Sequence, residues 1–67
     1  GKLQIEFSET VKNINLRLEN NIGQLIKQLQ INQQNQVEIN FENESKGIYF
    51  LSISEEKKKA VFKIVKN

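Results

Sequence analysis

The stretch Gly47-Ile48-Tyr49-Phe50-Leu51-Ser52-Ile53 is the longest apolar run in the sequence. It begins at a glycine and is followed by the charged segment 54–59. A run of this length, bounded by turn residues and rich in β-branched and aromatic side chains, predicts a buried strand. Tyr49, Leu51 and Ile53 share one face of this strand. Ile48, Phe50 and Ser52 share the other. Because both faces are largely apolar, we expect this strand in the middle of a sheet.

The neighbouring segment 60–66 alternates in the same way. Its apolar residues Ala60, Phe62 and Ile64 lie on one face, and Val61, Lys63 and Val65 lie on the other. The segment follows the 47–53 run after a short, lysine-rich connection. The two segments therefore predict an antiparallel hairpin.

Three earlier segments, 2–7, 13–18 and 36–41, also alternate and predict half-buried strands. Polar stretches separate them, and we expect turns or loops at residues 8–10, 20–23, 32–35 and 42–46. The inward-facing residues of these strands are expected to be Leu3, Ile5, Phe7, Ile14, Leu16, Leu18, Val37, Ile39 and Phe41.

Residues 24–31 fit two structures. Ile22, Leu25, Ile26 and Leu29 recur with the spacing of a helical stripe, but Leu25, Leu29 and Ile31 also fit one face of a strand. Two predicted strands precede this segment and more follow it. We therefore favour a strand that is bent or bulged near residues 27–28.

About six short strands with turn signals between them are typical of an all-β sandwich or barrel. With 67 residues the chain forms one domain at most, and it has no cysteine to support a fold this small. No window approaches the ~20 apolar residues of a membrane-spanning helix. We therefore expect a domain that does not insert into a membrane.

Residue types that carry enzymatic chemistry are scarce. The chain has no histidine, cysteine or aspartate, so no imidazole activates its hydroxyl groups and a transition-metal site is not expected. The glutamates fit solvated turns, and neither Gly23 nor Gly47 lies in a phosphate-binding pattern. The sequence predicts a protein that is not an enzyme, with no catalytic residue, no cofactor and no metal ion.

The formal net charge is +2, and five lysines lie in the last eleven residues. The run 57–59 would suit nucleic acid, but proteins that bind nucleic acid on a sheet interleave basic residues with exposed aromatics. The phenylalanines at positions 7, 41, 50 and 62 all fit core positions. We therefore expect a solvated hairpin turn and no nucleic-acid partner.

The sequence resembles the type A C-terminal sorting domain of the type 9 secretion system. Residues 46–53 look like the family's Gly-x-Tyr-x-Leu-x-Ile strand, and residues 62–66 look like its Lys-Ile-Val-Lys end. Residues 14–26 look like an upstream strand, turn glycine and apolar pair. One feature departs from the family: its opening Asn-Pro motif is missing, and Gly1 corresponds to a residue just after it.

The resemblance implies an all-β fold, a small immunoglobulin-like antiparallel β-sandwich of about six to seven short strands. It implies that residues 1–67 are a single C-terminal sorting domain, a fragment of a longer secreted protein of the Bacteroidetes. Such a domain targets its fused upstream passenger through the type 9 secretion system across the outer membrane. Its partners would be translocon or shuttle proteins and the sortase-like cysteine peptidase that cleaves it off. Its location would be the periplasm in transit, then the cell surface or the extracellular space.

The resemblance also suggests a recognition surface near the end of the hairpin, formed by Gly47, Tyr49, Lys63, Val65 and Lys66. A free strand edge there would accept a strand from a partner, or from a second copy in a homodimer. A purely structural role for Gly47 and Tyr49 is equally open. The alternative function is a small glycan- or protein-binding accessory module of a secreted enzyme or adhesin.

Overall fold

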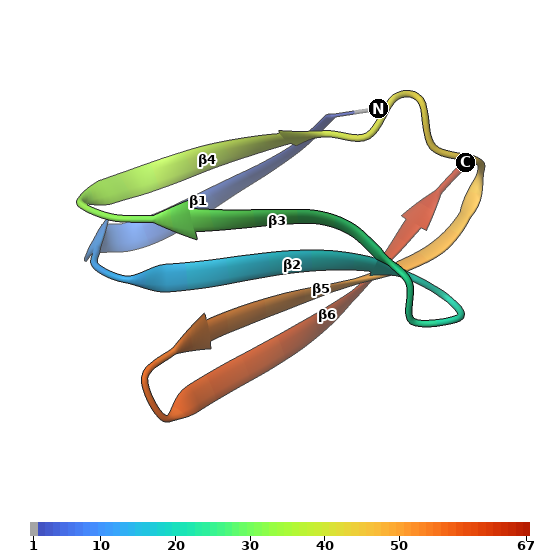
Figure 1. Ribbon diagram of the computed structural model, residues 1–67. Coiled ribbons are helices and arrows are strands. Elements are labelled where there is room, and N and C mark those ends of the chain that lie inside the picture. Colours follow the sequence, from blue (N-terminus) through green and yellow to red (C-terminus); the bar gives the residue numbers. More distant parts are fainter. Residues whose placement is uncertain (1) are drawn as a thin grey trace.

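The computed structural model describes residues 2–67. The described residues form six strands and no helix, and Figure 1 shows how the strands are arranged. The ambiguous segment is therefore a strand. The strands are β1 (Lys2–Val11), β2 (Ile14–Asn20), β3 (Leu25–Ile31), β4 (Gln34–Asn40), β5 (Gly47–Glu55) and β6 (Lys58–Lys66).

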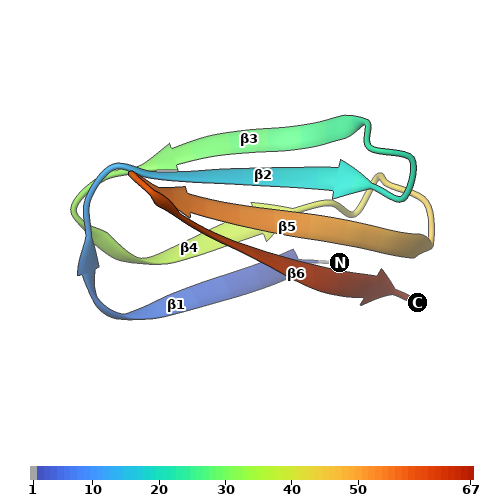
Figure 2. The ribbon, with the colours of Figure 1, turned by 90° about the horizontal axis from the view of Figure 1, so that it is seen from below.

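The strands form two antiparallel sheets that lie one above the other (Figures 1 and 2). The smaller sheet pairs β1 with β4, and the larger has the order β3-β2-β5-β6. Strand β5 has a partner on each side, as its two apolar faces predict. The prediction of an all-β sandwich is confirmed.

The core lies between the two sheets. Leu16, Leu18 and Ile31 are each about 1% exposed, so the inward faces of β2 and β3 are the best-packed part of the domain. β4 and β5 supply most of the rest. The buried apolar residues are Ile14, Leu16, Leu18, Ile31, Ile39, Phe41, Tyr49 and Leu51.

Two of the expected connections differ from the structure. The turn predicted at residues 8–10 is wrong, because β1 continues to Val11 and the chain turns at Asn13, which has a φ of 55°. Asparagine tolerates this left-handed conformation, so the turn moves to the residue best suited to it. The connection at 32–35 is also shorter than expected, since Gln33, with a φ of 57°, makes the turn and β4 begins at Gln34.

The predicted irregularity in β3 is present but lies slightly earlier. Leu18 pairs with Lys27 and the next residue, Glu19, pairs with Leu25, so Ile26 is the additional residue of a β-bulge. An additional residue in one strand changes which side chains face the core. This explains why the segment satisfies neither the helical nor the strand pattern along its whole length.

The expectation that all four phenylalanines are core residues is wrong for Phe62. Phe41 is 6% exposed, Phe7 and Phe50 are half-buried, and Phe62 is 50% exposed. Phe62 does lie on the inward face of β6, opposite Leu51. A two-stranded sheet is too narrow to cover a four-stranded one, so the inward face of β6 remains open at the edge.

Candidate recognition surface

The predicted hairpin is confirmed. A turn at residues 56–57, in which Glu56 has a φ of 48°, joins β5 to β6. The register runs from Glu55 opposite Lys58 at the turn to Gly47 opposite Lys66 at the far end. The free edge predicted at the end of the sheet is also present, because among the described strands β6 pairs with β5 alone.

The hairpin brings the five residues predicted for recognition to the same end, but on its two faces. Alternation from the register places Gly47, Tyr49 and Lys66 on the inward face. It places Lys63 and Val65 on the outward face. The five residues therefore do not form a single contact surface.

Tyr49 anchors the loop that precedes its own strand. Its side chain is 5% exposed, and its hydroxyl donates a hydrogen bond to the backbone carbonyl of Ser45. Its ring meets the ring of Phe41 edge-on, with centroids 5.7 Å apart and planes at 71°. This T-shaped arrangement is a favourable aromatic geometry. The polar and apolar parts of Tyr49 thus hold the two ends of the β4–β5 loop.

Lys66, the last residue of β6, binds the same loop. Its ammonium group donates hydrogen bonds to the carbonyl oxygens of Phe41, at 2.8 Å, and Glu42, at 3.0 Å, and also to that of Glu44. The nitrogen also lies 5.4 Å from the centre of the Phe41 ring, within cation–π range. We call this set of contacts, made by Phe41, Tyr49, Lys66 and loop residues 42–46, the end clamp.

Gly47 is the first residue of β5 and directly follows the loop of the end clamp. Its φ of 149° lies outside the range that residues with a side chain readily adopt. A β-carbon built at this position meets no atom within 4 Å, so the requirement for glycine concerns the backbone and not the space around it. The glycine therefore lets the loop enter β5 through a backbone conformation that other residues rarely adopt.

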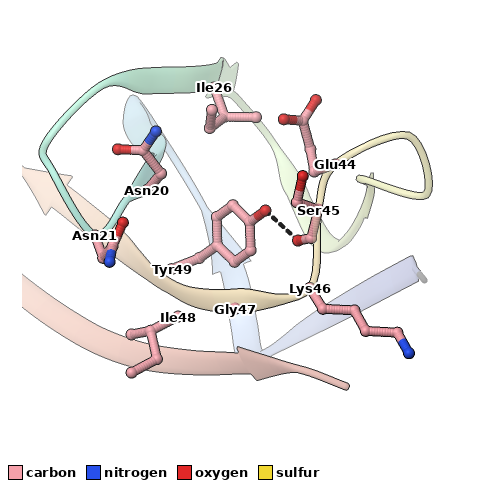
Figure 3. Close-up of a pocket in the computed structure, with 9 residues that line it drawn as sticks. All are labelled: Asn20, Asn21, Ile26, Glu44, Ser45, Lys46, Gly47, Ile48 and Tyr49. Carbon is pink, nitrogen blue, oxygen red and sulfur yellow. Dashed lines mark hydrogen bonds between the residues drawn. The ribbon is translucent and has the colours of Figure 1, made fainter.

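A cavity of about 220 Å³ lies beside the end clamp (Figure 3). Tyr49 points into it with its hydroxyl toward Ser45, while the side chain of Lys46 points away. On the opposite wall, the side chain of Asn20 accepts hydrogen bonds from the backbone amides of Ile22 and Gln24, at 3.1 and 2.9 Å. The side chain of Asn20 thus stabilises its own turn, which indicates that the cavity has a structural role.

Lys63 and Val65 are available to a partner. Lys63 is exposed, and neither of the two ion pairs within residues 2–67 involves it. Val65 is 57% exposed and stands opposite Ile48, which is 38% exposed. We call Ile48, Lys63 and Val65 the outward patch. It combines one free positive charge with an adjacent apolar surface.

Sequence reasoning missed the role of Lys66. Lys66 was predicted as part of the recognition surface, whereas the register places it on the inward face of β6 with Phe62 and Ile64. Its partners are backbone carbonyls of a loop, which leave no pattern in a sequence. The two terminal lysines therefore differ, with Lys66 bound within the domain and Lys63 free.

Within residues 2–67, no cluster of three or more acidic side chains lies in a position to hold a metal ion. The same residues contain no helix of the length and apolarity that crossing a membrane requires.

Comparison with protein families gives one match. The model of a family described as "Secretion system C-terminal sorting domain" matches residues 1–67. Comparisons with curated proteins and with solved structures found no match.

Proposed function

The chain belongs to the family of secretion system C-terminal sorting domains, and from that premise we propose how its hairpin is recognised during export. As a type 9 sorting signal, it interacts with the type 9 secretion machinery and directs export to the cell surface or the extracellular space. The observation that carries this function is the family match over the whole sequence. Nothing found supports the alternative of a glycan- or protein-binding accessory module.

The finer steps are proposals that follow from the family. The domain is fused to an upstream passenger, passes through the periplasm and the outer-membrane translocon, and is then removed by a sortase-like cysteine peptidase. It has no catalytic activity of its own. Its lack of histidine, cysteine and aspartate supports this, because the commonest general bases and nucleophiles are missing.

For recognition, the outward patch makes the direct contact with the machinery. Lys63 supplies a positive charge that attracts an acidic partner surface, and Val65 with Ile48 supplies an apolar area that is buried on contact. The end clamp acts indirectly. Tyr49 holds the β4–β5 loop to β5, Lys66 holds the end of β6 to the same loop, and Gly47 allows the backbone conformation between loop and strand, so the patch keeps one shape before it meets its partner.

A second copy of the chain can also bind at this edge, but more weakly than the secretion machinery. The free edge of β6 can pair with the β6 of a second copy. Each β6 carries four lysines, at positions 58, 59, 63 and 66, and like charges facing each other across strands are destabilising. We therefore expect a homodimer only at high protein concentration, with its amount rising as salt screens the lysines.

The proposal is tested with a reporter protein fused upstream of residues 1–67 in a host that has this pathway. Lys63→Glu reverses the charge of the outward patch and Val65→Asp removes its apolar surface, so each should reduce surface export by about tenfold or more. Lys57→Glu is the matched control, because it makes the same charge change at the exposed hairpin turn. Deletion of residues 65–67, which removes Val65 and Lys66 together, should abolish export.

Each variant domain is also purified, and its thermal unfolding is compared with the wild type, because only a folded variant reports on recognition. Export of Lys63→Glu and Val65→Asp at the wild-type level, with both domains folded, would refute the outward patch. An equal loss of export in Lys57→Glu would show that net charge matters and the position of the lysine does not.

A further inference from the structure

The outward face of the large sheet continues beyond the outward patch and crosses all four strands. Figure 2 shows β3, β2, β5 and β6 side by side. Leu25 on β3 stands opposite Glu19, and Glu19 stands opposite Phe50. Phe50 in turn stands opposite Lys63. Residues directly opposite each other share a face, so one row of side chains on the outward face leads from Lys63 on one edge strand to Leu25 on the other.

Exposed apolar side chains concentrate on this face. Among the described residues six large apolar side chains are exposed, and only Phe62 belongs to the inward face of a strand. Ile22 lies in the turn between β2 and β3. The register places the other four on the outward face: Leu25, Ile48, Val61 and Val65. An apolar surface gathered on one face in this way is typical of an interaction site.

The turn that precedes Leu25 is already ordered. The side-chain oxygen of Asn20 accepts hydrogen bonds from the amides of Ile22, at 3.1 Å, and Gln24, at 2.9 Å. The amide of Asn20 donates to the carbonyl of Gln24 at 3.0 Å. These bonds fix the turn while Ile22 at its tip is 72% exposed. Ile22 and Leu25 therefore lose little conformational freedom when a partner covers them.

The outward patch alone is small for a specific contact. A standard interface buries about 800 Å² on each partner, and three partly exposed side chains offer at most a few hundred Å². The contact must therefore extend beyond the patch. The exposed apolar side chains on the same face lie across the sheet toward β3, about 14 Å from β6 at the usual spacing of strands.

The charged residues of the face indicate which partner fits it. Among the described strands, the register places four charged side chains there, those of Arg17, Glu19, Lys59 and Lys63. Glu19 is the only acid of the four, and its carboxylate already lies 3.4 Å from the guanidinium group of Arg17. Three positive charges and one negative charge leave an excess of two positive charges. A partner with an acidic group opposite Lys63 is favoured, and a second copy of this face is disfavoured.

We propose that the secretion machinery binds the outward face across the whole width of the sheet, from Lys63 and Val65 on β6 to Leu25 on β3. The partner is a protein surface that is apolar over most of its area and carries a carboxylate that faces Lys63. Ile48 lies in the middle of the contact, and Ile22 lies at its margin. Because this surface extends the outward patch, the proposal rests on the proposed function.

The substitution Leu25→Gln tests the width of the contact, because Leu25 lies on the strand farthest from Lys63. Leu25 is 47% exposed, and loss of its apolar surface should lower surface export of the reporter fusion about fivefold or more. Phe62→Gln is the matched control. It removes an apolar side chain of similar exposure, 50%, from the inward face and should leave export within about twofold. Both side chains are half exposed, so both variants should fold, which thermal unfolding checks.

A series of substitutions at Lys63 tests the carboxylate of the partner. Lys63→Arg keeps the positive charge and should leave export within about twofold. Lys63→Gln removes the charge and should lower export about threefold. Lys63→Glu places a second negative charge beside the carboxylate and should lower export about tenfold or more.

Four results would overturn the proposal. The first is full export of folded Leu25→Gln while Lys63→Glu and Val65→Asp lose export, which would confine the contact to the outward patch. The second is an equal loss in Phe62→Gln and Leu25→Gln, which would show that the face does not matter. The third is equal export of Lys63→Gln and Lys63→Glu, which would show that no carboxylate faces Lys63. The fourth is a dimer of the isolated chain at micromolar concentration that Leu25→Gln converts to a monomer, which would identify a second copy as the occupant.

Failure of the proposed function gives a different result. Full export of both Lys63→Glu and Val65→Asp would refute recognition through the outward patch itself, whatever Leu25→Gln does. The two failures are therefore distinguishable in one set of fusions.

Discussion

Replacement of Lys66 by methionine isolates the contribution of the end clamp. Methionine keeps a long, flexible side chain in place and removes the three hydrogen bonds from the ammonium group and its contact with the Phe41 ring. A hydrogen bond from a charged donor contributes roughly 1.5–3 kcal/mol when it is buried. Lys66 is only half-buried and water can replace its ammonium group at the loop carbonyls, so each of its hydrogen bonds contributes much less than this to stability. The expected loss in the free energy of unfolding is about 2 kcal/mol altogether, including roughly 0.5 kcal/mol for the cation–π contact.

The loss is measurable as a change in melting temperature. A chain of 67 residues has an entropy of unfolding of about 0.14 kcal/mol/K, so a loss of about 2 kcal/mol lowers the midpoint by roughly 14 °C. The assay is thermal unfolding followed by circular dichroism. Lys63→Met is the matched control on the same strand, and it should change the free energy by less than about 0.5 kcal/mol because Lys63 is exposed.

A double-mutant cycle separates the ring contact from the hydrogen bonds. Phe41→Leu keeps a large apolar side chain and removes the aromatic ring, so it should cost less in the Lys66→Met background by about 0.5 kcal/mol. Equal melting temperatures for Lys66→Met and Lys63→Met would refute the end clamp, because they would show that the contacts of Lys66 contribute nothing to stability.

Three further predictions concern stability, each measured by chemical or thermal unfolding. Gly47→Ala should cost about 1–2 kcal/mol, because alanine is strained at a φ of 149°; an unchanged stability would show that the loop relaxes at no cost. Tyr49→Phe keeps the contact with Phe41 and loses the hydrogen bond to Ser45, so it should cost about 1 kcal/mol, and amide exchange in residues 42–46 should become faster. Leu16→Ala should cost about 2–5 kcal/mol and leave so small a domain largely unfolded at 37 °C; a cooperative transition near the wild-type midpoint would contradict the placement of the core on β2.

Much of the fold follows from alternation along the chain. The two apolar faces of the stretch from Gly47 to Ile53 correctly predict a central strand, and the nearness of residues 60–66 correctly predicts its hairpin partner. The missed turn at residues 8–10 shows the limit of composition as a guide, because Ser8, Glu9 and Thr10 are polar and yet extended. Their strand lies at an edge, where polar side chains face solvent on both sides.

The position of Phe62 shows a second limit. Alternation correctly indicates that its side chain faces the other sheet, but it carries no information about how wide that sheet is. Whether a residue on an inward face is covered depends on the number and order of strands opposite. Here a two-stranded sheet lies opposite a four-stranded one, and Phe62 on the edge strand β6 is 50% exposed.

The candidate site could be predicted only in part. The positions of Lys63 and Val65 on one exposed face follow from the period of two along a strand. The end clamp does not, because Lys66 binds backbone carbonyls in a loop 22 to 25 residues earlier in the chain. Backbone groups are the same for every residue, so a contact of this kind becomes visible only when the loop has been placed.

The most direct measurement of the central claim is the location of a reporter protein fused upstream of residues 1–67. It is compared in a host with an intact type 9 secretion system and in the same host without its translocon. The account predicts that the reporter reaches the cell surface or the medium only when the translocon is present. Retention of the folded fusion in the cell in both hosts, or equal release from both, would contradict it.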